Sequence, residues 1–166
     1  PQASIMPVVV GSGQSINMAL AIDGIYYAAD HGADVINASF GGSLSGAALD
    51  QLKAAVAYAR GKGTLFVTAA GNDNANRDTS PSYPANLDDP GVVTVGASTA
   101  DDTRASFSAY GSTNVDIFAP GLYVTSTSPD GSYKAVSGTS IASPLVAAAA
   151  ALARAQDRSL TPTQLR

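Results

Sequence analysis

The residues best suited to chemistry lie in the stretch VSGTSIASPLVAA (136–148), where Gly138, Thr139 and Ser140 directly precede an alanine-rich helical pattern. A serine at the start of a helix lies near the positive end of the helix dipole, and its backbone N–H can face a developing oxyanion. Ser140 is therefore a candidate nucleophile. The alternative is that Ser140 only caps the helix, which is a common role for serine at this position.

Asn72 is a second candidate, because it follows a predicted strand in the glycine turn AAGND (69–73). An amide side chain can donate a hydrogen bond to an anionic oxygen without adding charge, as the transition state of acyl transfer requires. The alternative is an ordinary turn asparagine. The double glycine of SFGG (39–42) could pair through its backbone with an extended peptide, although on its own it is merely a turn.

A nucleophilic serine normally needs a base, and the sequence contains one histidine, His31, and no cysteine. His31 ends a predicted helix of residues 16–31, which would be roughly 24 Å long at 1.5 Å per residue. The next predicted strand starts beside His31 and ends at SFGG, so we expect His31 at the amino end of the sheet, opposite Ser140. A general base must come within about 3 Å of its proton. We therefore expect His31 to stabilise the helix end instead.

The elements that must position these residues alternate along the chain. Short apolar runs predict strands, and apolar residues at helical spacing predict helices between them. This alternation indicates right-handed crossovers and a parallel sheet, in which functional groups gather beyond the carboxyl ends of the strands. We expect strands or extended segments at 5–10, 34–40, 64–70, 92–96, 115–119, 122–126 and 133–136, with helices at 16–31, 47–60 and after Gly138.

Capping signals refine two of these helices. Ser15 is the expected N-cap of the first helix and Gly32 its C-cap. Thr161 and Pro162 have the pattern of an N-cap followed by the first helical position, so a further helix is expected to start at the end of the sequence.

Composition excludes several classes of protein. The net charge of −4 and the absence of a basic stripe argue against nucleic acid as a partner. No apolar run is long enough to span a membrane. The absence of cysteine excludes a disulfide scaffold, a thiol enzyme and thiolate-bound zinc. A length of 166 residues corresponds to about one domain.

Taken together, several motifs resemble one family, the subtilisin-like serine proteases (subtilases). GTSIASPLVAAAAAL is similar to the nucleophile signature of that family, DVINASFGG to its substrate-binding strand and VTAAGND to its oxyanion strand. The later segments YPAN, VVTVGAS, RASFSAYG and DIFAPG resemble the family in sequence and order. The resemblance implies an α/β fold of three layers, with a mostly parallel central sheet flanked by helices.

The resemblance also implies roles for individual residues. Ser140 would be the nucleophile of a serine endopeptidase, Asn72 would donate to the oxyanion, and an extended peptide or protein would be the substrate. No cofactor would be required, and the protein would be secreted. A structural calcium ion is possible near YPAN, where Thr99 replaces a carboxylate ligand of some members and Asp101 and Asp102 are close by. The residues expected to bind substrate are Gly11, Ser12, Gly13, Ser39, Phe40, Gly41, Gly42, Ala69, Ala70 and Gly71.

Some features depart from the family pattern. The aspartate and histidine of the family's triad precede the segment that corresponds to residues 5–10, so we expect a complementary upstream segment to carry them. Both ends of the sequence look cut, and residues 1–166 are expected to form a partial peptidase domain. Leu145 and Ala148 replace a histidine and a glycine of the signature, which affects packing and not the triad.

Two other hypotheses remain beside an endopeptidase. A truncated relative could bind extended peptide along SFGG without cutting it. A general α/β hydrolase is disfavoured, because no G-x-S-x-G elbow is present. We also expect the isolated chain to aggregate or to need its upstream segment for stable folding, since a parallel sheet that lacks neighbouring strands exposes apolar edges.

Overall fold

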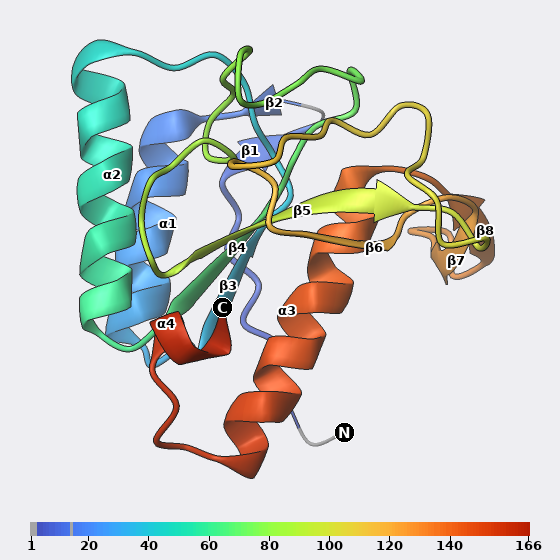
Figure 1. Ribbon diagram of the computed structural model, residues 1–166. Helices are drawn as coiled ribbons and strands as arrows, with labels where there is room; N and C mark the ends of the chain where they lie inside the picture. The colour runs from blue at the N-terminus through green and yellow to red at the C-terminus, as the bar shows by residue number, and fades with distance from the viewer. Residues whose placement is uncertain (1–2, 14) are drawn as a thin grey trace.

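The central feature of the fold is a parallel sheet of four strands in the order β3-β4-β5-β6 (Figure 1). The structure, a computed structural model, describes residues 3–13 and 15–166. Neighbouring strands pair in register, for example Val35 with Leu65 and Phe66 with Val92. The strands are β3 (Val35–Ala38), β4 (Leu65–Ala69), β5 (Val92–Ser98) and β6 (Ile117–Pro120).

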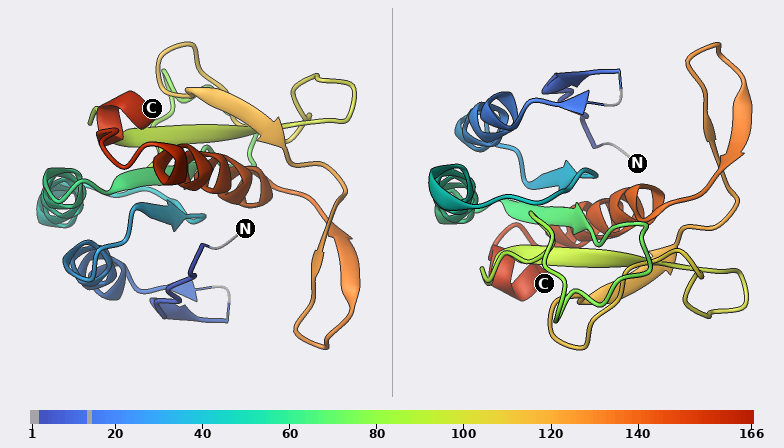
Figure 2. Two further views of the ribbon diagram at one scale, coloured as in Figure 1. Left: turned by 90° about the horizontal axis from the view of Figure 1, so that it is seen from below. Right: turned by 90° about the horizontal axis from the view of Figure 1, so that it is seen from above.

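Helices cover both faces of this sheet and make three layers (Figure 2). Alternating residues of β4 divide the core between them. Phe66 packs in a cluster with α1 (Met18–Asp30) and α2 (Gly46–Gly61), whereas Leu65 and Val67 pack in a cluster with α3 (Thr139–Gln156). A short helix, α4 (Pro162–Leu165), also contacts β4 and α3. The predicted three-layer, mostly parallel α/β fold is therefore confirmed.

Most predicted elements are present, with small differences at their ends. The extended segments near 122–126 and 133–136 form an antiparallel hairpin of β7 (Val124–Thr127) and β8 (Tyr133–Val136), which reaches away from the sheet in Figure 2. Thr161 caps α4 as expected, with its side chain accepting from Gln164 N. Among the described residues, no helix is long and apolar enough to cross a membrane.

The N-cap prediction for α1 is wrong. Asn17, not Ser15, caps this helix, because its Oδ1 accepts hydrogen bonds from Ala19 N at 3.0 Å and Leu20 N at 3.3 Å. Ser15 instead belongs to a two-residue strand, β2 (Ser15–Ile16), which pairs with β1 (Gly11–Ser12). The C-cap prediction for Gly32 is off by one residue: His31 is the C-cap, and Gly32 follows it with φ of +75°.

The strand predicted at 5–10 is also wrong. This segment pairs with no strand among the described residues, and Ile5 and Val9 are 91% and 85% exposed. Two of its valines nevertheless pack against α1. An added Cβ on Gly24 of that helix would lie 3.0 Å from side-chain carbons of both Val8 and Val10. A strand requires a hydrogen-bonded neighbour, and an apolar run alone does not supply one.

Candidate active site

Asn72 and the start of α3 are joined by a short hydrogen-bond network. β4 ends at Ala69, and Asn72 lies three residues further on, beside the first residue of α3. Asn72 Oδ1 accepts from Thr139 N at 2.8 Å and from Thr139 Oγ1 at 3.0 Å, while Thr139 Oγ1 accepts from Gly71 N at 3.1 Å. Because the carbonyl oxygen of the amide is occupied by Thr139, the orientation of the amide is fixed and Asn72 Nδ2 faces the other way.

Because Gly138 has no side chain, a space remains beside it that three polar atoms surround. An added Cβ at this glycine would lie 2.9 Å from Ser140 Oγ, 3.5 Å from Asn72 Nδ2 and 3.7 Å from Ser140 N. Gly138 has φ of +154°, a conformation that L side chains rarely adopt. The nucleophile candidate thus lies beside two N–H donors that can face one oxygen, which is the arrangement acyl transfer requires.

The backbone carbonyl of Ser140 accepts a hydrogen bond from a residue at the carboxyl end of β3. Pro144 lies in the interior of α3 and has no N–H to donate to the carbonyl four residues earlier, which is Ser140 O. Ser39 Oγ, just after β3, donates to Ser140 O at 3.1 Å instead. Asn37 supports this contact, since its Nδ2 donates to Ser39 Oγ at 2.9 Å and its Oδ1 accepts from Ser143 Oγ at 2.6 Å.

Only some of the residues predicted to bind substrate line a common groove. A groove of about 440 Å³ is lined by Gly13, Ile16, Met18, Ser39, Phe40, Gly41, Gly42, Ser43 and Leu44. Gly11 and Ser12 lie in the adjoining strand β1 and do not line it. Ala69 and Ala70 are only 9% and 1% exposed, so contacts to a ligand from that side would come from backbone and from half-buried Gly71.

The loop from Ser39 to Gly42 is anchored at its far end. Gly42 N donates to Tyr83 O at 3.0 Å and Tyr83 N donates to Gly42 O at 2.8 Å. Ser82 lies beside this pair, with Ser82 Oγ 3.5 Å from Gly42 O. Ser82 and Tyr83 therefore lie against the glycine turn that follows β3.

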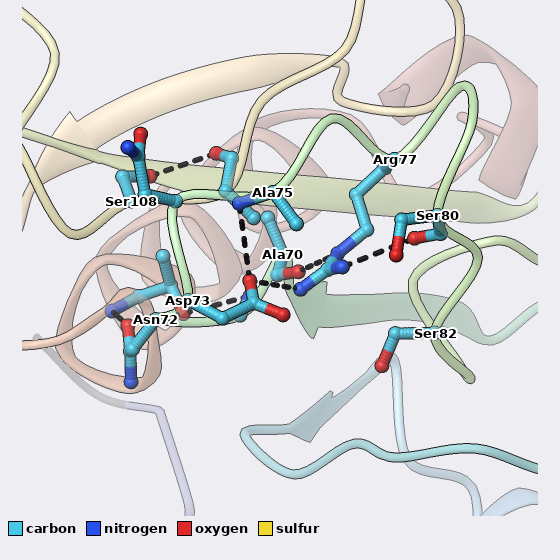
Figure 3. Close-up of polar contacts among 12 residues, drawn as sticks. Ala70, Asn72, Asp73, Ala75, Arg77, Ser80, Ser82 and Ser108 are labelled. Atoms are coloured by element: carbon cyan, nitrogen blue, oxygen red, sulfur yellow. Dashed lines mark hydrogen bonds and ion pairs between the residues drawn. The ribbon is translucent and has the colours of Figure 1, made fainter.

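A buried arginine that the sequence did not single out contacts both sides of Asn72 (Figure 3). Arg77 is 3% exposed, and it donates to Ala70 O and to the carboxylate of Asp73. The hydrogen bond from Arg77 holds the pKa of Asp73 below its ordinary value. The only signal in the sequence was an Asp and an Arg four residues apart in a turn-rich stretch.

His31 lies at the end of α1, as the sequence predicted, and is itself the C-cap residue. Its ring stacks on Tyr27 with centroids 3.9 Å apart, and its Nδ1 is 2.8 Å from Tyr27 O. β3 then runs from Val35 towards Ser39, whose hydroxyl bonds Ser140 O, so His31 and Ser140 lie at opposite ends of that strand. The one histidine of the sequence is therefore not placed to act on Ser140.

The loop near the expected calcium site does not offer a cluster of ligands. Thr99 Oγ1 is hydrogen-bonded to Thr103 Oγ1 at 2.9 Å and accepts from Asp101 N at 3.3 Å. Within residues 3–13 and 15–166, no group of three histidine, aspartate or glutamate side chains is placed to hold a metal ion. The side chains present do not fit a carboxylate-built site, and bound calcium stays a prediction from the sequence.

Comparison with known proteins agrees with this architecture. The subtilase family model matches residues 1–166. Thermitase of Thermoactinomyces vulgaris is 44% identical over 161 residues, 96% of this chain and 54% of thermitase. Subtilisin E of Bacillus subtilis (strain 168) is 41% identical over 171 residues, 100% of this chain and 42% of that protein. The crystal structure of a cold-adapted subtilisin-like serine proteinase matches with a TM-score of 0.83 at 41% identity, covering 95% of this chain and 55% of that one.

The sheet topology and these matches define a subtilisin-like α/β protein. The chain belongs to the subtilase family. It spans about half the length of the relatives it matches.

Proposed function

We propose that this chain contributes the nucleophile and the oxyanion donors of a serine endopeptidase. Membership of the subtilase family supports this reaction, and the geometry around Gly138 carries the assignment of residues. Ser140 Oγ is the proposed nucleophile, and Ser140 N with Asn72 Nδ2 are the proposed oxyanion donors. The triad aspartate and histidine would come from an upstream segment, because His31 lies at the wrong end of the sheet.

The proposed reaction proceeds through an ester on Ser140. Ser140 Oγ attacks the carbonyl carbon of a peptide bond while its proton passes to the upstream histidine. The carbonyl oxygen becomes an oxyanion between Ser140 N and Asn72 Nδ2. The C–N bond then breaks and the amine leaves with the proton, after which water hydrolyses the ester by the same route. Fixed donors stabilise the oxyanion because they need no reorganisation when the charge develops.

The substrate is proposed to be an extended peptide lying along the groove beside Ser39. The groove joins the backbone of Gly41 and Gly42 to Gly13, and exposed backbone of this kind can pair with a peptide strand. A free carboxylate would attract a basic side chain of the substrate, but Asp73, the acidic residue next to Asn72, is paired with Arg77. We therefore favour an apolar side chain next to the scissile bond. By family resemblance the protein would act outside the cell, and its recovery from culture medium would test this.

The test is fluorophosphonate labelling, performed on this chain and on the longer natural protein that contains it. Rapid labelling at Ser140 is expected only when the upstream aspartate and histidine are present, with parallel hydrolysis of peptide substrates. Ser140→Ala should abolish labelling. A folded natural protein that is not labelled at Ser140 would favour the second hypothesis, a peptide-binding scaffold.

A second pair of variants tests the geometry. Gly138→Ala places a methyl group at the point shared by Ser140 and Asn72, so labelling should be lost although Ser140 is intact. Gly131→Ala is the matched control, since Gly131 also has positive φ (+81°) but an added Cβ there meets nothing within 4 Å. Equal labelling of both variants would contradict the proposed site.

A further inference from the structure

We propose that Arg77 is a positioning residue that fixes the oxyanion-donating amide of Asn72. This inference rests on the proposed function of Asn72. Its physical basis is that one rigid, buried guanidinium binds the chain on both sides of that residue.

Each of the three guanidinium nitrogens of Arg77 donates to a different residue. Nε donates to Ala70 O at 2.7 Å, Nη2 to Asp73 Oδ1 at 2.5 Å and Nη1 to Ser80 O at 3.1 Å. Figure 3 shows the group pointing between these partners. Ala70 is two residues before Asn72 and Asp73 is one residue after it, so the two shorter bonds enclose Asn72. The planar guanidinium can serve such divergent acceptors at once, which an ammonium group cannot.

The backbone of Arg77 is also bound to residues outside the loop that carries Asn72. Its backbone N donates to Tyr110 O at 2.6 Å, and its backbone O accepts from Asn86 Nδ2 at 2.7 Å. The adjacent Asp78 binds a further loop through the backbone and side chain of Ser112. The guanidinium therefore extends from a backbone that is bound at residues 86 and 110. The segment 107–110 also binds the Asn72 loop directly, through Ala109 N to Gly71 O at 2.9 Å and Asn74 N to Phe107 O at 2.8 Å.

The turn after β4 packs closely against the side chain of Arg77. A Cβ at Gly71 would overlap Nη2 of Arg77, and Gly71 has φ of +112°, so position 71 requires glycine. On the opposite side Asn72 is held by Thr139. Asn72 thus lies between the start of α3 and Arg77. The backbone bonds from residues 107–110 hold the path of the loop, so loss of Arg77 is expected to shift the Asn72 amide without unfolding the loop. A displacement of about 1 Å in an active site can cost on the order of 100-fold in rate.

The experiment compares Arg77→Met, Arg77→Lys and Arg104→Met in the natural protein that contains this chain. Arg77→Met should lower kcat about tenfold or more with little change in KM, and Arg77→Lys should lower it less. Arg104→Met is the matched control. Arg104 bonds this loop at Asn74 Oδ1 (2.7 Å) and the supporting segment at Ser108 O (2.6 Å), but it does not enclose Asn72, so its loss tests general support of the loop. An unchanged kcat in Arg77→Met of an active protein would overturn the proposal.

A readout independent of activity separates this inference from the proposed function. In ¹⁵N-labelled protein, the side-chain amide signals of Asn72 should broaden or shift in Arg77→Met and stay as in wild type in Arg104→Met. If Arg77→Met does not fold, Asp73→Ala removes one of the two bonds that enclose Asn72, at a side chain that is 59% exposed, and should perturb the same signals. Asn72 signals that match wild type in the folded Arg77 or Asp73 variants would overturn the positioning role, even if no peptidase activity were found.

Discussion

At the scale of single residues, the two polar atoms of the Asn72 amide have different partners. Oδ1 accepts from Thr139, and Nδ2 faces the point beside Gly138 and Ser140. The contact of Oδ1 with Thr139 stabilises the folded structure, whereas Nδ2 is the proposed donor to the oxyanion. A substitution that preserves one atom and changes the other can therefore separate stability from activity.

Asn72→Asp and Asn72→Ala should give different results. Asp keeps an acceptor for Thr139 and loses the donor, so the melting temperature should stay near wild type while kcat falls by about 10²–10³, the magnitude known for this donor in subtilisin itself, a relative of this chain. Ala loses both atoms, so kcat should fall similarly and stability should fall by about 1 kcal/mol, because Thr139 N–H loses its partner. Peptide hydrolysis and thermal melts measure the two effects. Full activity in Asn72→Asp would show that Nδ2 does not act on the oxyanion.

The sequence predicted the two central residues but not what holds them. Ser140 and Asn72 lie in short motifs whose residue types already indicate their chemistry. Arg77 could not be assigned in this way, because its acceptors include the backbone carbonyls of Ala70 and Ser80. Any residue type supplies such a carbonyl, and only the path of the loop decides which ones meet the guanidinium.

At the scale of elements, Ser39 after β3 compensates for a hydrogen bond that Pro144 removes from α3. Proline removes one helical hydrogen bond to Ser140 O, and Ser39 Oγ replaces it from the carboxyl end of β3. The first turn of the helix that carries Ser140 is thereby tied to the strand that borders the groove. The predicted strand at 34–40 included Ser39, which lies just after β3, but a sequence pattern could not show that Ser39 donates to a carbonyl in α3.

A double-mutant cycle tests this link. Ser39→Ala should lower stability by about 1 kcal/mol or more, since Ser140 O loses its donor. In Pro144→Ala the helical N–H is restored, so Ser39→Ala should cost less, with a coupling of about 1 kcal/mol. Chemical denaturation of the four proteins measures it, and Ser43→Ala in the same loop is the control. Additive effects of Ser39→Ala and Pro144→Ala would show that the two groups do not share Ser140 O.

Asp78 joins two loops and should make stability depend on acid. Its carboxylate accepts five hydrogen bonds from residues 112–114, from Ser112 N and Oγ, Thr113 N, and Asn114 N and Nδ2. Partial desolvation alone would raise the pKa of Asp78, but these bonds outweigh it and lower the pKa from 3.8 to about 2. A carboxyl whose pKa falls on folding stabilises the folded state above its unfolded pKa, and that contribution is lost as the pH drops towards the folded pKa.

The expected outcome is a stability difference between wild type and Asp78→Asn that is constant near neutral pH. The difference should shrink as the pH falls from about 4 to about 2, because wild type then becomes protonated as well. Melting temperatures across this range measure it, with Asp23→Asn on the exposed face of α1 as the baseline for losing one carboxylate. A difference that is the same at every pH would assign the effect of Asp78→Asn to shape and not to charge.

At the scale of the whole molecule, several large apolar side chains of the described structure are exposed. Four exposed residues of α3 lie at helical spacing and form a single stripe: Leu145, Ala148, Ala149 and Leu152. Ile5 and Val9 add exposed apolar surface, and β3 is an edge strand of the sheet among the described residues. The periodicity of the sequence predicted the layers correctly, but it could not tell an apolar face that is covered from one that is open.

This open apolar surface predicts self-association of the 166-residue chain in isolation. Exposed apolar side chains and unpaired strand edges favour association, because association removes them from water. Sedimentation velocity over a wide concentration range should show growing species. Val9→Gln with Leu152→Gln should reduce them without changing net charge, whereas Tyr133→Gln, at a 73% exposed position on the distant hairpin, should not. Addition of an upstream segment that covers the stripe should have the same effect as the double substitution. A chain that stays monomeric at every concentration and melts cooperatively and reversibly would show that these surfaces are stable in water and need no partner.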